Sequence, residues 1–481
     1  FWSQQYSEWD EIQPPRRMPS IANPTQQLDF ARFSSDALLA LYSAEREVLR
    51  AITPDVPVTT NFMGFFKPVN YWQWAAQEDI VSNDSYPDPS EPDAPIQAAM
   101  AGDLMRSLGN GRPWVLMEQT PSQVNWRAIN VLKRPGQMRL WSLQALARGA
   151  DGVMFFQWRA SRAGAEKFHG GMVPHGGTEE ARVWREVVEL GAELRQLDGL
   201  RDARTPAEVA CMLDWESWWA LELDSKPSAD VLQLDLLTRY YRPLYARNIA
   251  VSFVEPTAAL DDYRVVIVPN LYLIREGVAE RLRRFVEGGG RLVVGFFSGI
   301  VDVNDHILLG GYPAPLRELL GLRVDEFDPF VPDQTNSLAA WDGVSYRCDE
   351  WADVITLKGA ESLATFERDF YAGRAAITRH RVGKGAAYYV GTRPEPAGLA
   401  ALLRQVCDEA GVAAPRAVPA GVEMVVRQTS DCRYVFVLNQ QGNAVTVPAP
   451  PAAVDALSGE PASDPLRLGP YGAIILRVPL P

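Results

Sequence analysis

The stretch of this sequence that decides the fold is Trp114-Val115-Leu116-Met117-Glu118-Gln119-Thr120-Pro121-Ser122. Its four apolar residues predict a buried strand, and a polar turn follows Glu118. Catalytic groups of β/α barrels lie at the carboxyl ends of the strands, so the position of Glu118 predicts a nucleophile or an acid. The alternative is a core carboxylate satisfied by backbone amides, which we favour less because buried acids are seldom unpaired.

The sequence on both sides of Glu118 alternates helix and strand patterns, which is typical of a β/α repeat. Four strands are expected, at residues 56–62, 79–82, 114–117 and 152–158, with helices at 28–50, 72–77, 96–108, 137–148 and 179–197. A TIM barrel needs eight strands in typically about 250 residues. Residues 1–203 therefore predict the second half of a (β/α)8 barrel, with a sheet that is either open or paired with a missing half.

Two further domains are predicted after this region. Residues 204–414 place short helices between apolar strands such as 209–213, 265–268 and 291–294, which predicts a doubly wound α/β domain. Residues 415–481 contain short alternating strands such as 424–427 and 434–438, separated by Asn-, Pro- and Gly-rich turns. This pattern predicts a small antiparallel β domain.

Composition excludes several classes of partner. The net charge of −13 argues against nucleic-acid binding, which needs basic side chains on phosphates. No apolar run reaches the roughly 18 residues of a membrane span. The four dispersed cysteines predict buried thiols in a reducing, cytoplasmic compartment, with no disulfide framework, metal site or other cofactor. The 14 Trp, 16 Tyr and 18 Phe residues can form flat surfaces for the apolar faces of sugars.

Several side chains are expected close to Glu118. Trp126 lies eight residues further on, and Phe156 ends the next predicted strand. The Gly-rich loop 159–177, which follows that strand, carries Glu166 and His169. Trp126 could instead be a core ring, and the loop charges could simply be solvated. A loop beside Glu118 could also hold sugar hydroxyls, with Glu166 and His169 acting together.

The chain resembles glycoside hydrolase family 42, the bacterial β-galactosidases. The resemblance extends through all three regions and rests on Thr59-Thr60-Asn61-Phe62-Met63-Gly64, Trp114 to Ser122, Asn125-Trp126, Arg134-Pro135-Gly136 and Phe155-Phe156-Gln157-Trp158-Arg159. It implies a catalytic barrel, then a glutamine-amidotransferase-like domain that mediates homotrimers and lacks the amidotransferase nucleophile, then a small β domain.

The resemblance also implies roles for single residues. Glu118 corresponds to the nucleophile of a retaining mechanism that releases terminal β-D-galactose, and Trp126 and Phe156 correspond to sugar-facing rings. Glu166 and His169 correspond to the pair that holds the galactosyl hydroxyls. The substrate implied is a small-molecule or oligosaccharide β-galactoside.

One departure from the family pattern concerns the second carboxylate that glycoside hydrolysis needs. The family's acid/base Glu lies in an Asn-Glu dipeptide after the fourth barrel strand, and this sequence, which starts at Phe1, contains no Asn-Glu. The resemblance therefore implies the carboxyl-terminal portion of such an enzyme. Two alternatives remain: an α-L-arabinopyranosidase, because that sugar shares the stereochemistry of galactose, or a non-catalytic assembly or carbohydrate-binding module.

Overall fold

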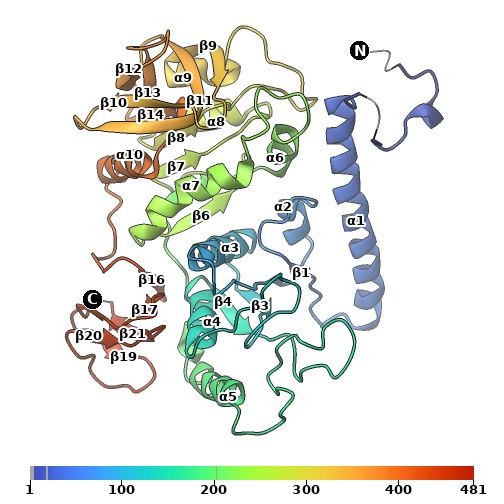
Figure 1. Ribbon diagram of the computed structural model, residues 1–481, viewed down its shortest axis with the longest axis vertical. Coiled ribbons are helices and arrows are strands. Elements are labelled where there is room, and N and C mark those ends of the chain that lie inside the picture. Colours follow the sequence, from blue (N-terminus) through green and yellow to red (C-terminus); the bar gives the residue numbers. More distant parts are fainter. Residues whose placement is uncertain (1–4, 18–19, 202, 481) are drawn as a thin grey trace.

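The computed structural model describes residues 5–17, 20–201 and 203–480. They form three units in chain order, the first two built around one sheet each and the third around two (Figure 1). A four-stranded parallel sheet comes first, an eleven-stranded mixed sheet second, and two small antiparallel sheets last. None of the helices in the described ranges combines the length and the apolarity that crossing a membrane requires.

The first unit confirms four strands, paired in the order β1-β2-β3-β4. The strands are Asn61–Phe62 (β1), Val81–Asp84 (β2), Trp114–Glu118 (β3) and Ala150–Val153 (β4), and the helices are Pro24–Ile52 (α1), Tyr71–Ala75 (α2), Ala94–Leu108 (α3), Gln137–Ala147 (α4) and Arg182–Leu194 (α5). The strand expected at 56–62 is too long, because only Asn61 and Phe62 pair with β2. The strand expected at 152–158 is also too long, because the chain leaves the sheet after Val153. The helix expected at 179–197 is also too long at both ends.

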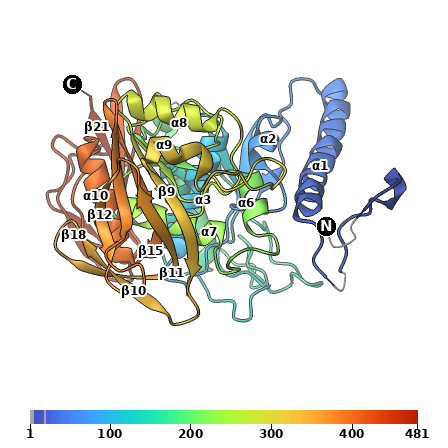
Figure 2. The same ribbon diagram turned by 90° about the horizontal axis from the view of Figure 1, so that it is seen from above.

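Helix α1 begins where its sequence favours a start. The Asn23 side chain accepts a hydrogen bond from the Thr25 amide at 2.9 Å, and Pro24 occupies the first turn, where it needs no N–H partner. Leu28, Ser35 and Tyr42, seven residues apart, are buried on one face. The other face leaves large apolar side chains exposed, namely Phe33, Leu41, Val48 and Ile52. Helix α1 therefore has a second apolar face that the described residues do not cover, and it stands along one side of the molecule (Figures 1 and 2).

The second unit contains the predicted parallel layer. Strands β14, β8, β7, β5 and β6 are paired in that order, and every pair is parallel. Successive side chains of one strand enter two different cores: Val265 and Ile267 lie in one, Val266 and Val268 in the other. A parallel sheet that is buried on both faces explains why these strands read as continuous apolar runs. The elements are Val209–Met212 (β5), Trp215–Leu221 (α6), Gln233–Ala246 (α7), Val251–Val254 (β6), Val265–Val268 (β7), Val278–Glu287 (α8), Arg291–Gly295 (β8), Gly385–Val390 (β14) and Pro396–Glu409 (α10).

An antiparallel extension continues the same sheet from β14, and the sequence analysis did not predict it. It is made of Leu322–Pro329 (β9), Thr335–Ala340 (β10), Ser345–Leu357 (β11), Glu361–Phe366 (β12), Ala375–Val382 (β13) and Thr392–Pro394 (β15), with the short helix Arg317–Leu320 (α9) before them. The third unit is antiparallel, as predicted. It contains Val422–Gln428 (β16), Cys432–Asn439 (β17), Val445–Val447 (β18), Val454–Asp455 (β19), Leu466–Leu468 (β20) and Ala473–Pro479 (β21).

Helix α6 joins the first two units through its tryptophans. The indole N–H of Trp215 donates to the Phe66 carbonyl at 3.1 Å, and that of Trp219 donates to the Lys67 carbonyl at 2.6 Å. In return, Trp72 of α2 donates to the Leu213 carbonyl at 3.0 Å. Buried residues of both units belong to one continuous apolar core. The four-stranded sheet is thus held firmly on the side that faces the second unit.

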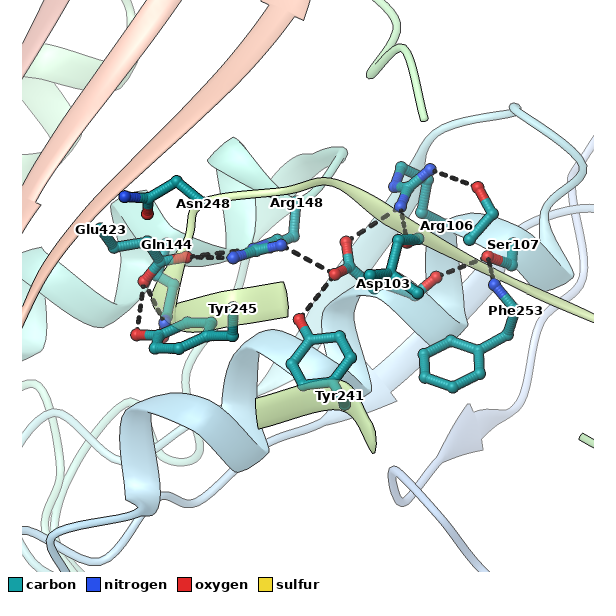
Figure 3. A network of polar contacts seen from close by, with 12 residues as sticks. Asp103, Arg106, Ser107, Gln144, Arg148, Tyr241, Tyr245, Asn248, Phe253 and Glu423 are labelled. Atoms are coloured by element: carbon teal, nitrogen blue, oxygen red, sulfur yellow. Dashed lines mark hydrogen bonds and ion pairs between the residues drawn. The ribbon is translucent and has the colours of Figure 1, made fainter. Parts of the chain in front are cut away.

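A buried ionic network joins all three units (Figure 3). Arg148, just after α4, pairs with Asp103 of α3 at 2.7 Å and with Glu423 of β16 at 2.6 Å. Tyr241 and Tyr245 of α7 donate their hydroxyls to the same two carboxylates at 2.7 and 3.2 Å. Each buried charge therefore has an opposite charge and further hydrogen bonds, which such groups need to be tolerated in a core.

Candidate active site

Glu118 ends β3 and is half-buried. Parallel pairing sets it opposite Asp84, the last residue of β2. Its backbone carbonyl accepts a hydrogen bond from the Ser85 amide at 2.8 Å. The Tyr86 hydroxyl donates to Glu118 Oε2 at 2.6 Å. The predicted strand-end carboxylate therefore lies in the sheet where expected, with one oxygen bonded and fixed in direction.

Tyr86 is a site residue that the sequence analysis did not identify. Burial, and then the hydrogen bond to Glu118, hold the pKa of Tyr86 well above its ordinary value. Its hydroxyl thus remains a hydrogen-bond donor at any physiological pH. The carbonyl of Tyr86 accepts from the guanidinium of Arg127, which also pairs with Asp88 at 3.2 Å. A tyrosine two residues beyond a strand has no sequence signature, and only the pairing of β2 with β3 brings it to Glu118.

The buried amine of Lys133 holds the turn that follows Glu118. Lys133, 1% exposed, donates from Nζ to the Thr120 carbonyl at 2.6 Å and to Gln119 Oε1 at 3.2 Å. Gln119 in turn donates to the Ser142 hydroxyl of α4 at 2.6 Å. Burial, and then the charge of Arg127, lower the pKa of Lys133 to about 7. The residues next to Glu118 are therefore held by groups inside the unit and not by solvent.

Three aromatic side chains pack around His169, and one of them is Tyr86, which binds Glu118. The ring centroids of Phe156, Trp126 and Tyr86 lie 4.9, 5.4 and 5.9 Å from that of His169. Trp126 also meets Tyr86 edge-to-face at 4.9 Å. Trp126 is 57% exposed, so it is not a core ring and its indole is free to contact a ligand. The structure thus brings three of the predicted residues, Trp126, Phe156 and His169, to the tyrosine that binds Glu118.

His169 and Glu166 differ sharply in exposure. His169 is 1% exposed, and its Nδ1 lies 2.9 Å from the Gly170 carbonyl, so Nδ1 carries the hydrogen. Its Nε2 is buried and has no hydrogen-bond partner among the described residues. Glu166 is exposed, its carbonyl accepts from the His169 amide at 2.9 Å, and its charge contributes to the raised pKa of Tyr86. The buried acceptor His169 Nε2 and the exposed carboxylate of Glu166 therefore belong to one turn of the chain, next to the aromatic rings.

Hydrogen bonds join the two loops that carry these residues. The side chain of Asn125 donates to the Ala165 carbonyl at 2.8 Å, and that of Gln123 donates to the Phe168 carbonyl at 3.1 Å. The Gly170 amide donates to the Gln123 carbonyl at 2.8 Å. The loop after β3 and the loop after β4 thus form a single wall of the site.

The cysteines lie outside this site, in the second and third units. All four cysteines are buried free thiols, as predicted. Within the described ranges, no group of three or more His, Cys, Asp or Glu side chains is arranged to hold a metal ion. The chemistry available at Glu118 is that of a carboxylate beside aromatic rings and hydroxyl-binding groups, which suits nucleophilic attack on a sugar.

Comparison with known proteins places each part of the chain. Residues 1–197 match a family described as beta-galactosidase, residues 207–413 the beta-galactosidase trimerisation domain, and residues 421–478 the beta-galactosidase C-terminal domain. The three units thus correspond to a partial TIM-barrel catalytic domain, an α/β trimerisation domain and a carboxyl-terminal β domain.

Individual relatives agree with these matches. Beta-galactosidase BgaB of a Geobacillus species is 54% identical over 450 residues, which are 94% of this chain and 67% of that protein. Beta-galactosidase LacZ of Heyndrickxia coagulans is 46% identical, over 99% of this chain and 71% of its own length. The crystal structure of beta-galactosidase from Bacillus circulans sp. alkalophilus superposes with a TM-score of 0.96 at 42% identity, covering 99% of this chain and 72% of that one. A catalytic mutant of Gan42B, a GH42 beta-galactosidase from G. stearothermophilus, also gives a TM-score of 0.96, at 34% identity over 100% of this chain and 72% of the other. This chain belongs to glycoside hydrolase family 42, the β-galactosidases.

Proposed function

We propose that this chain carries the nucleophile side of a retaining β-galactosidase active site, with Glu118 as the nucleophile. The observation that carries the proposal is the 2.6 Å hydrogen bond from Tyr86 to Glu118 Oε2. A carboxylate with one oxygen fixed by a donor presents the other oxygen in a defined direction. Such an oxygen can attack an anomeric carbon and form a glycosyl-enzyme, which water then hydrolyses.

The galactosyl group is held by the wall beside Glu118. Trp126 offers an exposed indole face to the C–H bonds of the sugar, and Phe156 closes the apolar side of the site. His169 Nε2, buried and without a partner among the described residues, accepts a hydrogen bond from a sugar hydroxyl. Glu166 accepts from a second hydroxyl. A buried acceptor of this kind favours a sugar with a hydroxyl at that position, because an analogue without it leaves Nε2 unpaired.

The acid/base carboxylate comes from a further strand that completes the barrel. Strands β1 and β4 each pair on one side only among the described residues, and the outer apolar face of α1 is exposed. Parallel strands with free edges are normally closed into a barrel or covered. We infer an eight-stranded barrel in which a carboxyl about 5 Å from Glu118 protonates the leaving oxygen and then activates water.

The second unit assembles the protein as a homotrimer. Its match to a trimerisation domain supports this role, and so does its amidotransferase-like parallel layer. At the turn after β8, Gly295-Phe296-Phe297-Ser298-Gly299 places Phe297 at φ +55°, the position at which a G-x-C-x-G turn would carry its nucleophile. A phenyl ring there has no nucleophilic chemistry, which leaves assembly as the role of this unit.

Hydrolysis of p-nitrophenyl β-D-galactopyranoside by the protein at its native length tests the proposal. We expect activity in the wild type and, in Glu118→Gln, a loss of about 10⁴-fold or more, the scale seen when a covalent nucleophile is removed. Glu91→Gln, which changes an exposed acid of the loop after β2, is the matched control and should retain full activity. Unchanged turnover in Glu118→Gln would contradict the proposal. A higher kcat/KM on p-nitrophenyl α-L-arabinopyranoside than on the galactoside would identify the enzyme as an α-L-arabinopyranosidase instead.

A further inference from the structure

A second carboxyl lies beside Glu118, and none of the roles described above uses it. Asp84 ends β2 and is the register partner of Glu118 at the end of β3. On its other side, the side-chain amide of Asn61 in β1 donates to Asp84 Oδ2. Asn61, Asp84 and Glu118 therefore stand on three adjacent strands, Asp84 and Glu118 at the carboxyl ends of β2 and β3 and Asn61 at the start of β1.

The other oxygen of Asp84 is enclosed by protein but unpaired among the described residues. Asp84 Oδ1 is buried and has no hydrogen-bond partner among the described residues. Burial raises the pKa of Asp84, the Asn61 hydrogen bond lowers it, and the neighbouring charge of Glu118 raises it further, to about 6. Asp84 thus ionises about one pH unit below neutrality.

The titratable groups around Asp84 carry either no charge or a negative one. Tyr71 of α2 and Tyr86 both have pKa values raised mainly by burial, so both stay neutral. Glu118 faces Asp84 from β3, and Glu166 acts on Tyr86 from the loop after β4. When Asp84 ionises, its charge is therefore opposed by Glu118 and is not neutralised by a partner.

We propose that Asp84 is a positioning residue for Glu118: its ionised carboxyl, fixed by Asn61, raises the energy of the nucleophile's negative charge and so accelerates formation of the glycosyl-enzyme. This inference rests on the proposed role of Glu118. It assigns to Asp84 no contact with the substrate and no proton transfer to the leaving group.

The charges of the first chemical step explain the effect. Glu118 forms a bond to the anomeric carbon while the bond to the leaving oxygen breaks, and the electron pair departs with that oxygen. The Glu118 carboxylate becomes a neutral ester, so its repulsion by Asp84 is present before the step and absent after it. Positive charge that develops on the sugar ring is also stabilised by a second nearby carboxylate. Both effects favour the transition state over the bound substrate.

The pH dependence of kcat/KM in Asp84→Asn is the first test. In the wild type at native length, activity on p-nitrophenyl β-D-galactopyranoside should rise as the pH passes through about 6, where Asp84 ionises. Asp84→Asn should lose this rise and fall about 10- to 100-fold at pH 7.5, the scale of one unit charge acting over a few ångström. Asp84→Glu, which restores the charge, should recover part of the loss. Glu91→Gln should leave the profile unchanged. A wild-type profile in Asp84→Asn would overturn the inference.

The leaving group distinguishes this role from that of a general acid. If Asp84 acts through Glu118, Asp84→Asn should lower kcat/KM by about the same factor for aryl galactosides with good and with poor leaving groups. A missing general acid instead costs far more for poor leaving groups, since only they need protonation. A loss in Asp84→Asn that grows steeply with the pKa of the leaving phenol would overturn the inference.

A stability measurement tests the repulsion between Asp84 and Glu118 without relying on enzyme activity. At pH 7.5, Asp84→Asn and Glu118→Gln should each raise the urea midpoint, and the double variant should gain less than the sum, because each change relieves the same repulsion. At pH 4.5, where Asp84 is protonated, this coupling should vanish. A wild type inactive on every galactoside would contradict the proposed function, while the coupling would still support the pairing of the two carboxyls. Additive effects at both pH values would overturn the pairing.

Discussion

At the scale of single residues, the site depends on groups that fix Glu118 from several directions. Tyr86 holds one carboxylate oxygen, and Lys133 holds the turn that follows through Thr120 and Gln119. Lys133 is an unusual support, because burial holds the pKa of its amine near 7. The ammonium form is therefore costly in the folded protein, and Lys133 contributes order to the turn at the expense of stability near neutral pH.

The pH dependence of stability tests this role of Lys133. In the unfolded chain the amine keeps its proton up to about pH 10.4, whereas in the folded protein it loses it near pH 7. Between these values the unfolded state binds more protons, so stability should rise with pH, by up to about 1.4 kcal/mol per pH unit. We expect Lys133→Met to lack this rise between pH 7 and 9 in urea unfolding.

Lys167→Met, which changes an exposed lysine of the neighbouring loop, is the control for Lys133→Met and should follow the wild type. If the stability difference between wild type and Lys133→Met were constant from pH 7 to 9, the lowered pKa would be contradicted.

Sequence reasoning found the part of the site that lies along the chain and missed the part made by pairing between strands. Glu118 was predicted because an apolar strand ends on it. Trp126, Phe156, Glu166 and His169 followed from the loops and from the family resemblance, and their roles stay predictions. Tyr86 and Asp84 were not singled out, since each reaches Glu118 only through the parallel register of β2 and β3.

At the scale of elements, helix α4 connects strand β3 to the rest of the protein. Trp114, at the start of β3, donates its indole N–H to the Arg148 carbonyl at 3.1 Å, and Ser142 of α4 binds Gln119, which directly follows β3. The guanidinium of Arg148 binds Glu423 of the third unit (Figure 3). The small β domain therefore supports the helix that supports both ends of β3.

Breaking this network at Glu423 should destabilise the whole protein. Glu423 accepts from Arg148, Gln144 and Tyr245, and its side chain is fully buried. Glu423→Gln leaves the Arg148 charge partly unpaired, which we expect to cost about 3 kcal/mol in urea unfolding, as is typical for one partner of a buried pair. Adding Arg148→Met should restore part of the loss, since the two groups are coupled.

Asp198→Asn provides the comparison for Glu423→Gln, because the Asp198–Arg201 ion pair is highly exposed. It should leave the urea midpoint unchanged. If Glu423→Gln had as little effect as Asp198→Asn, the network would not be what holds the three units together.

Helices and parallel strands were predicted better than the antiparallel extension. The helix around residues 28–50 has an Asn cap at its start and apolar residues at helical spacing. The strands of the parallel layer are short and continuously apolar. Strand β11, by contrast, spans Ser345–Leu357 and pairs with shifts in register, so its side chains do not alternate cleanly between two faces. A strand with bulges lacks the period of two on which recognition from sequence depends.

At the scale of the whole molecule, the second unit shares its core with an open four-stranded sheet. The core shared by the two units fixes the four strands on one side. Within the described residues, the outer edges of β1 and β4 have no partner strand and the outer face of α1 has no cover. The proposed barrel closure and trimer would bury these surfaces or place them against neighbours.

The proposed trimer predicts a defined mass in solution. Light scattering coupled to size exclusion of the protein at native length should give three times the mass of one chain at micromolar concentration. Dilution to nanomolar concentration should not change this value if the interface is extensive and apolar, as in obligate assemblies. A monomer at micromolar concentration would contradict the assembly role of the second unit.

Covalent capture of the nucleophile tests the central claim most directly. A 2-deoxy-2-fluoro-β-D-galactoside with a good leaving group should inactivate the protein at native length, because the fluorine slows hydrolysis of the glycosyl-enzyme more than it prevents its formation. Mass spectrometry should then find one fluorogalactosyl group per chain, attached to the peptide that contains Glu118, and none in Glu118→Gln. A label on any other carboxylate, or steady hydrolysis of β-galactosides by Glu118→Gln, would contradict the assignment.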